Sequence, residues 1–456
     1  MQSRFFSFRC YAGLLLLLCA VRAFGAVGAT DGVVAATNDQ PESAPCPAGQ
    51  APNTQCLRGR DSMGAHYWLA MPKQWNGTLV VHAHGGPELG TPKVQRPADD
   101  MTRWSIWTRA GFAYAGSGYR QGGVAVRSAA EDTERVRQRF VAQFGAPKLT
   151  VLHGQSWGAG VAVKAAEMAR QSDPGKSPYD AVLLTNGVLG GGVQSYNFRL
   201  DLRVVYQALC NNHPRPDEPA YPLWQGLPLD SKLTRKELEE RVDACTGVRR
   251  PAAARSPEQQ ARLDTLLRSV RIQERSLVGH LNWATWHFQD IAWHRMQGRN
   301  VFGNERVQYG VKGQDDALNA TVARYRADPS AVAAFAWDAD AEGRIAVPVL
   351  TMHATNDPIA FVELESFFRE RMVSGGQGDN LVQVFTDDSE HSYLSDAQYV
   401  TAISALLEWT RGGVKPTAVA ISRRCAGVEA VFEPATGCRF LPEFSPAALA
   451  ARVPPR

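Results

Sequence analysis

A serine stands at the apex of a turn that would expose its hydroxyl. Residues 154–158 read GQSWG, with the apolar run 149–152 before them and the small-residue run 159–166 after them, the pattern of strand, sharp turn and helix. Glycines two places on either side of Ser156 leave room for a turn so tight that the serine must adopt strained backbone geometry. The motif occurs once, and an ordinary glycine-rich turn is the alternative. We predict that Ser156 is a nucleophile.

A serine hydroxyl is a poor nucleophile near neutral pH, so it needs a base, and the base needs an orienting carboxylate. Asp357 follows the strand expected over 347–352, and His391 follows the strand expected over 381–385. Both residues lie in loops at the carboxyl ends of strands, beside the turn that carries the serine. The sequence therefore predicts a catalytic triad of Ser156, His391 and Asp357.

The tetrahedral intermediate of acyl transfer needs N–H donors aimed at its oxyanion. The backbone N–H of Trp157, directly after the serine, is one candidate. Residues 84–87, HGGP, end the strand expected over 77–82, and their glycines let the backbone turn N–H groups toward a substrate. We expect the second donor to be Gly86, with Gly85 as the next choice; a plain glycine turn is the alternative.

Short apolar runs alternate with helical stretches over much of the chain. Strands are expected at 67–70, 77–82, 112–115, 149–152, 181–184, 347–352 and 381–385, and helices at 98–110 and 129–144. Short apolar strands separated by helices are typical of a parallel sheet that is covered on both faces. The expected fold class is therefore α/β, with a mostly parallel sheet flanked by helices.

The alternation breaks at residues 193–342, where the periodicity is mostly helical and the best helices cover 232–245 and 258–296. We interpret this segment as a helical cap over the site; a second, unrelated helical domain is the alternative. The chain is thus divided into a leader (1–29), a first core part (30–192), the cap (193–342), a second core part (343–412) and a tail (413–456). Residues 30–60 are polar and irregular, and the tail shows little periodicity.

Together, the serine turn, the HGG loop, the late aspartate and the late histidine resemble the α/β-hydrolase superfamily of serine hydrolases, over about residues 80–410 without the cap. The resemblance implies the chain order serine, acid, histidine, and a cap inserted after the sixth strand. His391 is the only histidine after Asp357, so this order favours it. The rival residues are His84, His153, His287, His294, His353, Asp387 and Asp388. The rival histidines precede Asp357, and the rival aspartates crowd His391 and follow the other strand.

Two branches of the superfamily compete. Residues 71–79, MPKQWNGTL, resemble the lead-in of exported bacterial hydrolases that act on carboxylic esters. The HGGP loop, with Trp157 after the serine, resembles the proline iminopeptidase branch, which implies cleavage of short peptides from the N-terminus. The chain departs from that branch at two places. Glu88 stands where the branch has a glycine, and residues 116–120 (GSGYR) replace its Asp-Gln-Arg-Gly segment. We therefore expect an esterase, with the peptidase as the alternative and a non-catalytic binding module as a third reading.

Aromatic residues gather in the predicted cap, where they are Trp283, Trp286, Phe288 and Trp293. They could form a wall for an apolar or aromatic acyl group, which makes Trp283 and Trp286 substrate-binding candidates. Packing of the cap onto the body is the alternative, because an aromatic stripe on a helix more often lies in a core. The expected substrate is a small ester or a short peptide.

The N-terminus has the pattern of a secretory leader. Two arginines precede an apolar stretch over 12–21, and small residues follow, with cleavage expected after Gly25 or Ala29. The stretch is too short to span a bilayer comfortably, so a retained anchor and a lipoprotein through Cys19 are the less favoured readings. We expect a secreted or periplasmic protein with no stable membrane span.

Composition argues against one class of partner. The formal charge of +4 falls to about +1 once the three arginines of residues 1–29 are removed. No basic stripe stands out, so nucleic acid is not an expected partner. Hydrophobic residues make up 44% of the chain, enough for a sizeable core. The sequence does not indicate the oligomeric state.

Six cysteines follow the leader in three local pairs. They are Cys46 and Cys56, Cys210 and Cys245, and Cys425 and Cys438. An even count in an exported protein suggests disulfides, and the simplest connectivity joins the members of each pair. Buried free thiols are the alternative. None of the six has the C-x-x-C spacing of a zinc site, so zinc is not suggested. We expect no metal and no cofactor.

Overall fold

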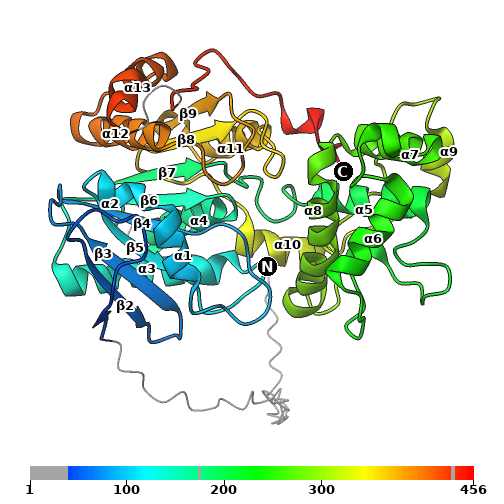
Figure 1. Ribbon diagram of the computed structural model, residues 1–456, viewed down its shortest axis with the longest axis horizontal. Helices are drawn as coiled ribbons and strands as arrows, with labels where there is room; N and C mark the ends of the chain where they lie inside the picture. The colour runs from blue at the N-terminus through cyan, green and yellow to red at the C-terminus, as the bar shows by residue number, and fades with distance from the viewer. Residues whose placement is uncertain (1–39, 173–175, 433–436) are drawn as a thin grey trace, which may run out of the picture. The chain divides into compact units, whose positions relative to one another are not determined.

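A mixed sheet of nine strands runs through the chain in the order β1-β2-β3-β5-β4-β6-β7-β8-β9 (Figure 1). The computed structural model describes residues 40–172, 176–432 and 437–456, so the predicted leader lies outside the described residues. Strands β1, β2, β3 and β5 pair antiparallel, and the strands from β5 to β9 are parallel. The strands are β1 (Glu42–Ser43), β2 (Gln55–Arg60), β3 (His66–Met71), β4 (Thr78–Ala83), β5 (Ala113–Ser117), β6 (Leu149–Gln155), β7 (Ala181–Thr185), β8 (Val349–Ala354) and β9 (Leu381–Thr386).

Alternate residues of each strand point into two separate cores. Leu79 and Val81 of β4 belong to one hydrophobic cluster, whereas Val80 belongs to the other. The first core lies beneath α3 (Val126–Phe144), α4 (Trp157–Ser172) and α11 (Leu364–Ser374), and the second beneath α1 (Arg96–Arg103), α2 (Ile106–Arg109), α12 (Asp396–Gly412) and α13 (Ala418–Phe432). Every residue of β4, β5, β7 and β8 is buried, which is why these strands read as continuous apolar runs. The predicted fold class is confirmed.

Two local predictions are wrong. Residues 30–60 were expected to be irregular, but Gln55–Arg60 forms β2 and pairs along its whole length with β3. Only two residues of β2 are buried, so it carries no apolar run. The tail was expected to lack periodicity, yet Ala418–Phe432 forms α13 against α12. Its buried residues are only Ile421 and Cys425, which leaves too narrow an apolar stripe to read as a helix.

Helices fill the chain between β7 and β8, and no strand lies in this part of the described residues. They are α5 (Asn197–Cys210), α6 (Arg235–Thr246), α7 (Pro257–Val270), α8 (Leu277–Asn282), two π-helical segments (Trp283–His287 and Asp290–Arg295), α9 (Asp316–Thr321) and α10 (Pro329–Ala339). We call residues 186–348 the insertion. The stretch expected as helix over 258–296 is interrupted after α7, where Arg271 adopts a φ of +57°. The insertion follows the seventh strand rather than the sixth because the two-residue β1 precedes the others.

Three disulfides join the cysteines as the simplest connectivity predicted. Cys46 pairs with Cys56, Cys210 with Cys245, and Cys425 with Cys438. The second bond links the end of α5 to the end of α6 within the insertion. Among the described helices, none combines the length and the low polarity that crossing a bilayer requires.

Candidate active site

Ser156 lies in the turn between β6 and α4 with a φ of +57°, in the left-handed region that serine rarely adopts. Its N–H donates to the Thr185 carbonyl at 3.0 Å, and its carbonyl accepts from the Val188 N–H at 2.9 Å, so the end of β7 holds the turn in place. A Cβ at Gly154 would lie 2.4 Å from the Gly158 carbonyl, and one at Gly158 would lie 2.1 Å from the Ala83 carbonyl. Both glycines are therefore required by close backbone contact, as the motif predicted.

The structure brings Ser156, His391 and Asp357 together from three loops. Ser156 Oγ lies 2.7 Å from His391 Nε2, and His391 Nδ1 lies 2.7 Å from Asp357 Oδ2. Asp357 Oδ1 accepts from the N–H groups of Ile359 and Ala360 at 2.7 and 3.0 Å. Since Nδ1 donates to the carboxylate, Nε2 is left to accept the proton of the serine hydroxyl.

Two residues that the sequence analysis missed hold the histidine loop. The side-chain N–H groups of Asn186 and Gln155 donate to the His391 carbonyl at 2.7 and 3.2 Å. Asn186 Oδ1 also accepts from the Ala354 N–H at 2.9 Å, which ties the loop to the end of β8. Asn186 has a φ of +43°, a conformation that asparagine tolerates better than most residues. An asparagine directly after a buried strand was the only sequence signal for it.

A buried histidine lies behind the aspartate. His353 Nδ1 is 3.0 Å from Glu365 Oε1, and Nε2 is 2.9 Å from the Ala360 carbonyl, so both ring nitrogens face acceptors and both carry protons. Burial alone would lower the pKa of His353, but the hydrogen bond to Glu365 and the nearby carboxylates raise it. Its Nε2 also lies 3.7 Å from Asp357 Oδ2. A hydrogen-bonded His353–Glu365 pair therefore lies behind the aspartate.

The other rival residues lie in settings that do not suit them to these roles. Burial lowers the pKa of His84 and of His153 to about 3 and that of His287 to about 4, so these rings are too weakly basic to suit a general base near neutral pH. His294 lies in the second π-helical segment, away from the histidine loop along the chain. Asp388 accepts from the side chains of Gln398 and Arg439, so its two carboxylate oxygens already have donors.

The loop after β4 is held through its carbonyl groups. The Gly85 carbonyl accepts from Arg96 Nη2 at 2.6 Å, and the Pro87 carbonyl lies 3.0 Å from His287 Nε2 of the insertion. The C=O of one residue and the N–H of the next point in opposite directions across a trans peptide. Fixing the Gly85 carbonyl on Arg96 therefore turns the Gly86 N–H away from that side.

Gly85 lies directly against the nucleophile. A Cβ there would come within 2.9 Å of Ser156 Cβ and 2.8 Å of the Gln155 carbonyl. Gly86 follows with a φ of +68° and open space beside it. Within the described chain, the N–H groups of Gly86 and Trp157 donate to no protein acceptor. Both are therefore available to a bound oxyanion.

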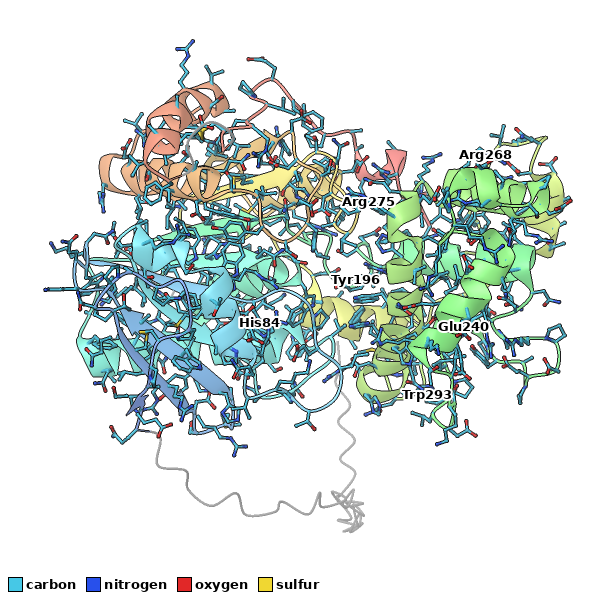
Figure 2. All side chains as sticks on the ribbon, viewed as in Figure 1. His84, Tyr196, Glu240, Arg268, Arg275 and Trp293 are labelled. Atoms are coloured by element: carbon cyan, nitrogen blue, oxygen red, sulfur yellow. A yellow bond between two sulfur atoms is a disulfide. The ribbon has the colours of Figure 1, made fainter. Side chains whose placement is uncertain are left out.

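Trp283 connects the insertion to this loop, whereas Trp286 does not. The Trp283 ring stacks on Tyr196 with centroids 4.1 Å apart and on His287 at 4.4 Å, and His287 contacts the loop after β4. Figure 2 shows Tyr196 between the sheet and the helices of the insertion. Trp286 instead lies under the guanidinium of Arg235, 4.7 Å from the ring centroid, and packs within the insertion.

Three features identify the fold. They are the order of the strands in the sheet, the serine turn between β6 and α4, and the loops that carry Asp357 and His391. The chain has the α/β-hydrolase fold. Among the described residues no group of three or more metal-ligating side chains is placed to hold a metal ion.

Several solved hydrolase structures are similar to this chain. Feruloyl esterase B from Aspergillus oryzae is 14% identical, with a TM-score of 0.40 over 80% of this chain and 81% of that one. An esterase from Aspergillus oryzae is 12% identical, with a TM-score of 0.44 over 83% and 87% of the two chains. Candida antarctica lipase A is 10% identical, with a TM-score of 0.41 over 84% and 83%. No family model matches the sequence, and no curated protein matches it.

Proposed function

We propose that this protein is a serine hydrolase that cleaves carboxylic esters through an acyl-enzyme. One observation carries the proposal: the unbroken series of two 2.7 Å contacts from Ser156 Oγ through the His391 ring to Asp357, with the serine in a strained turn. A nucleophile, a base and an orienting carboxylate in this geometry are the arrangement that acyl transfer requires.

In the proposed reaction, Ser156 Oγ attacks the ester carbonyl carbon while its proton passes to His391 Nε2. Asp357 holds the ring in the correct tautomer and stabilises the imidazolium. The N–H groups of Trp157 and Gly86 bind the oxyanion. The intermediate collapses as His391 returns the proton to the leaving alkoxide, and a water molecule, activated by the same ring, then hydrolyses the acyl-enzyme.

The alternative is an aminopeptidase of the proline iminopeptidase type. Such an enzyme must bind the substrate ammonium, which calls for carboxylates of the insertion near the site. The acids of α6 lie elsewhere: Glu237 binds Thr234 in a capping box, and the 59%-exposed side chain of Glu240 pairs with Lys236 (Figure 2). Arg199, a buried cation of the insertion, packs on Trp283, which stacks on His287 beside the loop after β4, and this cation would repel an ammonium. These contacts favour an ester.

We also propose that the protein is exported and works outside the cytoplasm. Three disulfides support this, because reducing pools in the cytosol keep most thiols free. The predicted helical cap is proposed to be the insertion, residues 186–348, which contacts the loop after β4 through His287.

The test is a panel of p-nitrophenyl esters of rising chain length beside aminoacyl-p-nitroanilides, including that of proline, with fluorophosphonate labelling of the same samples. Wild-type protein should hydrolyse the esters and be labelled, and Ser156→Ala should do neither while keeping its circular dichroism spectrum. Release of proline with weak esterase activity would favour the peptidase. A folded wild-type protein that the probe fails to label would favour a non-catalytic binding module.

A further inference from the structure

Arg199 is a buried cation without an acidic partner. It lies in the first turn of α5, is 4% exposed, and forms no salt bridge with a described residue. Among the described residues, its guanidinium makes one hydrogen bond, which Nη1 donates to the Ser195 carbonyl at 3.4 Å. Nε is fully buried and has no partner in the part of the chain that the structure describes. Charged side chains are almost never buried unless they are paired, because removing a charge from water is costly.

Aromatic rings surround this guanidinium. Its central carbon lies 4.4 Å from the Trp283 ring centroid, 4.7 Å from that of Phe198 and 5.1 Å from that of Tyr196. Cation–π contacts orient a guanidinium and offset part of its desolvation, but they leave its N–H groups without acceptors. Burial lowers the pKa of Arg199 to about 10, because no nearby carboxylate offsets the loss of solvation.

Arg203, one turn further along α5, shows how the same helix treats a buried arginine away from the site. It is also buried, and its Nε likewise has no partner among the described residues, but its Nη1 and Nη2 donate to the carbonyls of His213 and Gly226 and to the Tyr221 hydroxyl, at 3.0 to 3.4 Å. The insertion supplies three acceptors to Arg203 and a single long one to Arg199. The two arginines therefore differ in the acceptors offered to Nη1 and Nη2, while Nε lacks a partner in both.

That position adjoins the catalytic loops by two routes. Trp283, beneath the guanidinium, stacks on His287, which contacts the Pro87 carbonyl in the loop after β4. On the other side, Phe198 packs edge-on against His280, with centroids 4.9 Å apart. His280 Nε2 lies 3.0 Å from the Pro358 carbonyl, directly after the proposed acid. Ring contacts therefore link the cation both to the loop after β4 and to the loop that carries Asp357.

We propose that Arg199 is a specificity-determining residue that binds a carboxylate of the substrate, so that the preferred esters carry a negative charge. This inference rests on the proposed esterase function and names its substrate class. A planar guanidinium matches a carboxylate with two parallel N–H···O bonds, which would give the unpaired nitrogens the acceptors that the protein withholds.

The first measurement compares wild-type kcat/KM within two matched pairs of esters. Mono-4-nitrophenyl adipate and 4-nitrophenyl hexanoate differ by a carboxylate on the acyl side. 4-Carboxyphenyl butyrate and 4-carbamoylphenyl butyrate differ by one on the alcohol side. We expect the anionic ester to be preferred in at least one pair. A wild-type preference for the neutral ester in both pairs would overturn the proposal without affecting the esterase assignment.

The second measurement uses Arg199→Gln and Arg199→Lys, with Arg203→Gln as the matched control. A charge-assisted hydrogen bond of about 1.5–3 kcal/mol corresponds to about a tenfold to a hundredfold loss for the anionic ester in Arg199→Gln. The neutral ester should change by less than about threefold, and Arg199→Lys should lose less than Arg199→Gln, since it keeps the charge but not the fork. Arg203→Gln should leave the ratio unchanged. Equal losses for both members of each pair would show that Arg199 only packs the insertion.

A binding measurement separates this inference from the proposed function. Monomethyl adipate should bind Ser156→Ala protein, detected by calorimetry, and binding should disappear in Ser156→Ala/Arg199→Gln. Binding that is lost in this way supports the carboxylate site even if no ester is turned over. Binding that is absent in Ser156→Ala, or unchanged in the double variant, counts against it.

Discussion

The body and the insertion both bury charge near Ser156, but they treat it differently. In the body, each oxygen of Asp357 has a donor, and His353 behind it faces an acceptor at each ring nitrogen. In the insertion, Arg199 has one long hydrogen bond and no carboxylate partner among the described residues. The contrast suggests that the reacting groups are preorganised by the fold itself, whereas the groups that select a substrate are left for the substrate to complete.

The largest expected effect tests whether residues of the body carry out the reaction. His391→Ala removes the base, so kcat on a neutral ester should fall by about 10⁴- to 10⁶-fold, and fluorophosphonate labelling should fall with it. His294→Ala, an exposed histidine of the insertion, is the control and should keep wild-type kcat. A His391→Ala protein within tenfold of wild type would remove His391 from the proposed mechanism.

Exchanging the acid for its amide tests whether the carboxylate, rather than its shape, orders the site. Asp357→Asn keeps the packing but lets the His391 ring adopt the wrong tautomer, so kcat should fall by about 10⁴-fold. The matched control is Asp388→Asn, at the rival acid, which should change kcat little. Similar losses of kcat in the two variants would mean that they disturb the histidine loop, and not the tautomer of His391.

The charge pair behind the acid predicts a pH-dependent stability. The pKa of His353 is raised above its ordinary 6.5, so its stabilising contribution is complete below pH 6.5 and is lost as the pH rises through the folded-state pKa. Breaking a buried pair costs about 3–5 kcal/mol, so His353→Gln should be less stable than wild type by about that much near pH 6. Urea unfolding should show the difference shrinking toward pH 9. A difference that does not change with pH would mean that the ring is not charged.

Removing a crosslink should weaken the insertion more than the tail. Cys210→Ser/Cys245→Ser opens a loop with a sequence separation of 35, against 13 for Cys425→Ser/Cys438→Ser. Each loss should lower the free energy of unfolding by about 2–4 kcal/mol, with the larger loss for the longer loop. Denaturant titrations of both double variants measure this, and a larger loss in the tail variant would contradict it.

The smallest expected effect separates the two predicted substrate-binding tryptophans. Trp286→Phe disturbs the contact with Arg235 and should cost about 0.5–1 kcal/mol of stability while leaving kcat/KM for both esters of a pair unchanged. Trp283→Phe should instead narrow the preference for the anionic ester, because Trp283 lies beneath Arg199. A change in kcat/KM for Trp286→Phe alone would reverse their roles.

The sequence predicts those structural features that depend on a few neighbouring residues. The turn at Ser156 follows from two glycines, and the strands of the sheet follow from short apolar runs, so the body could be predicted. By contrast, β2 is too exposed to show an apolar run, and α13 buries too few residues to show a stripe.

The supporting groups of the site could not be predicted for another reason. Asn186 and the His353–Glu365 pair act through partners on other elements, and no spacing along the chain records those contacts. Arg199 resembles any other arginine until Tyr196 and Trp283 close around it. These are properties of tertiary packing, which a single sequence does not display.

The disulfides also fix the covalent topology of the chain. Each joins cysteines that are close in sequence, with separations of 10, 35 and 13, so the described chain consists of three small rings joined by open segments. No ring encloses both Ser156 and His391. A backbone cut between residues 247 and 348 would therefore leave the serine and the histidine on separate polypeptides, held together by packing alone, whereas a cut inside the Cys210–Cys245 ring would leave them on one covalent molecule.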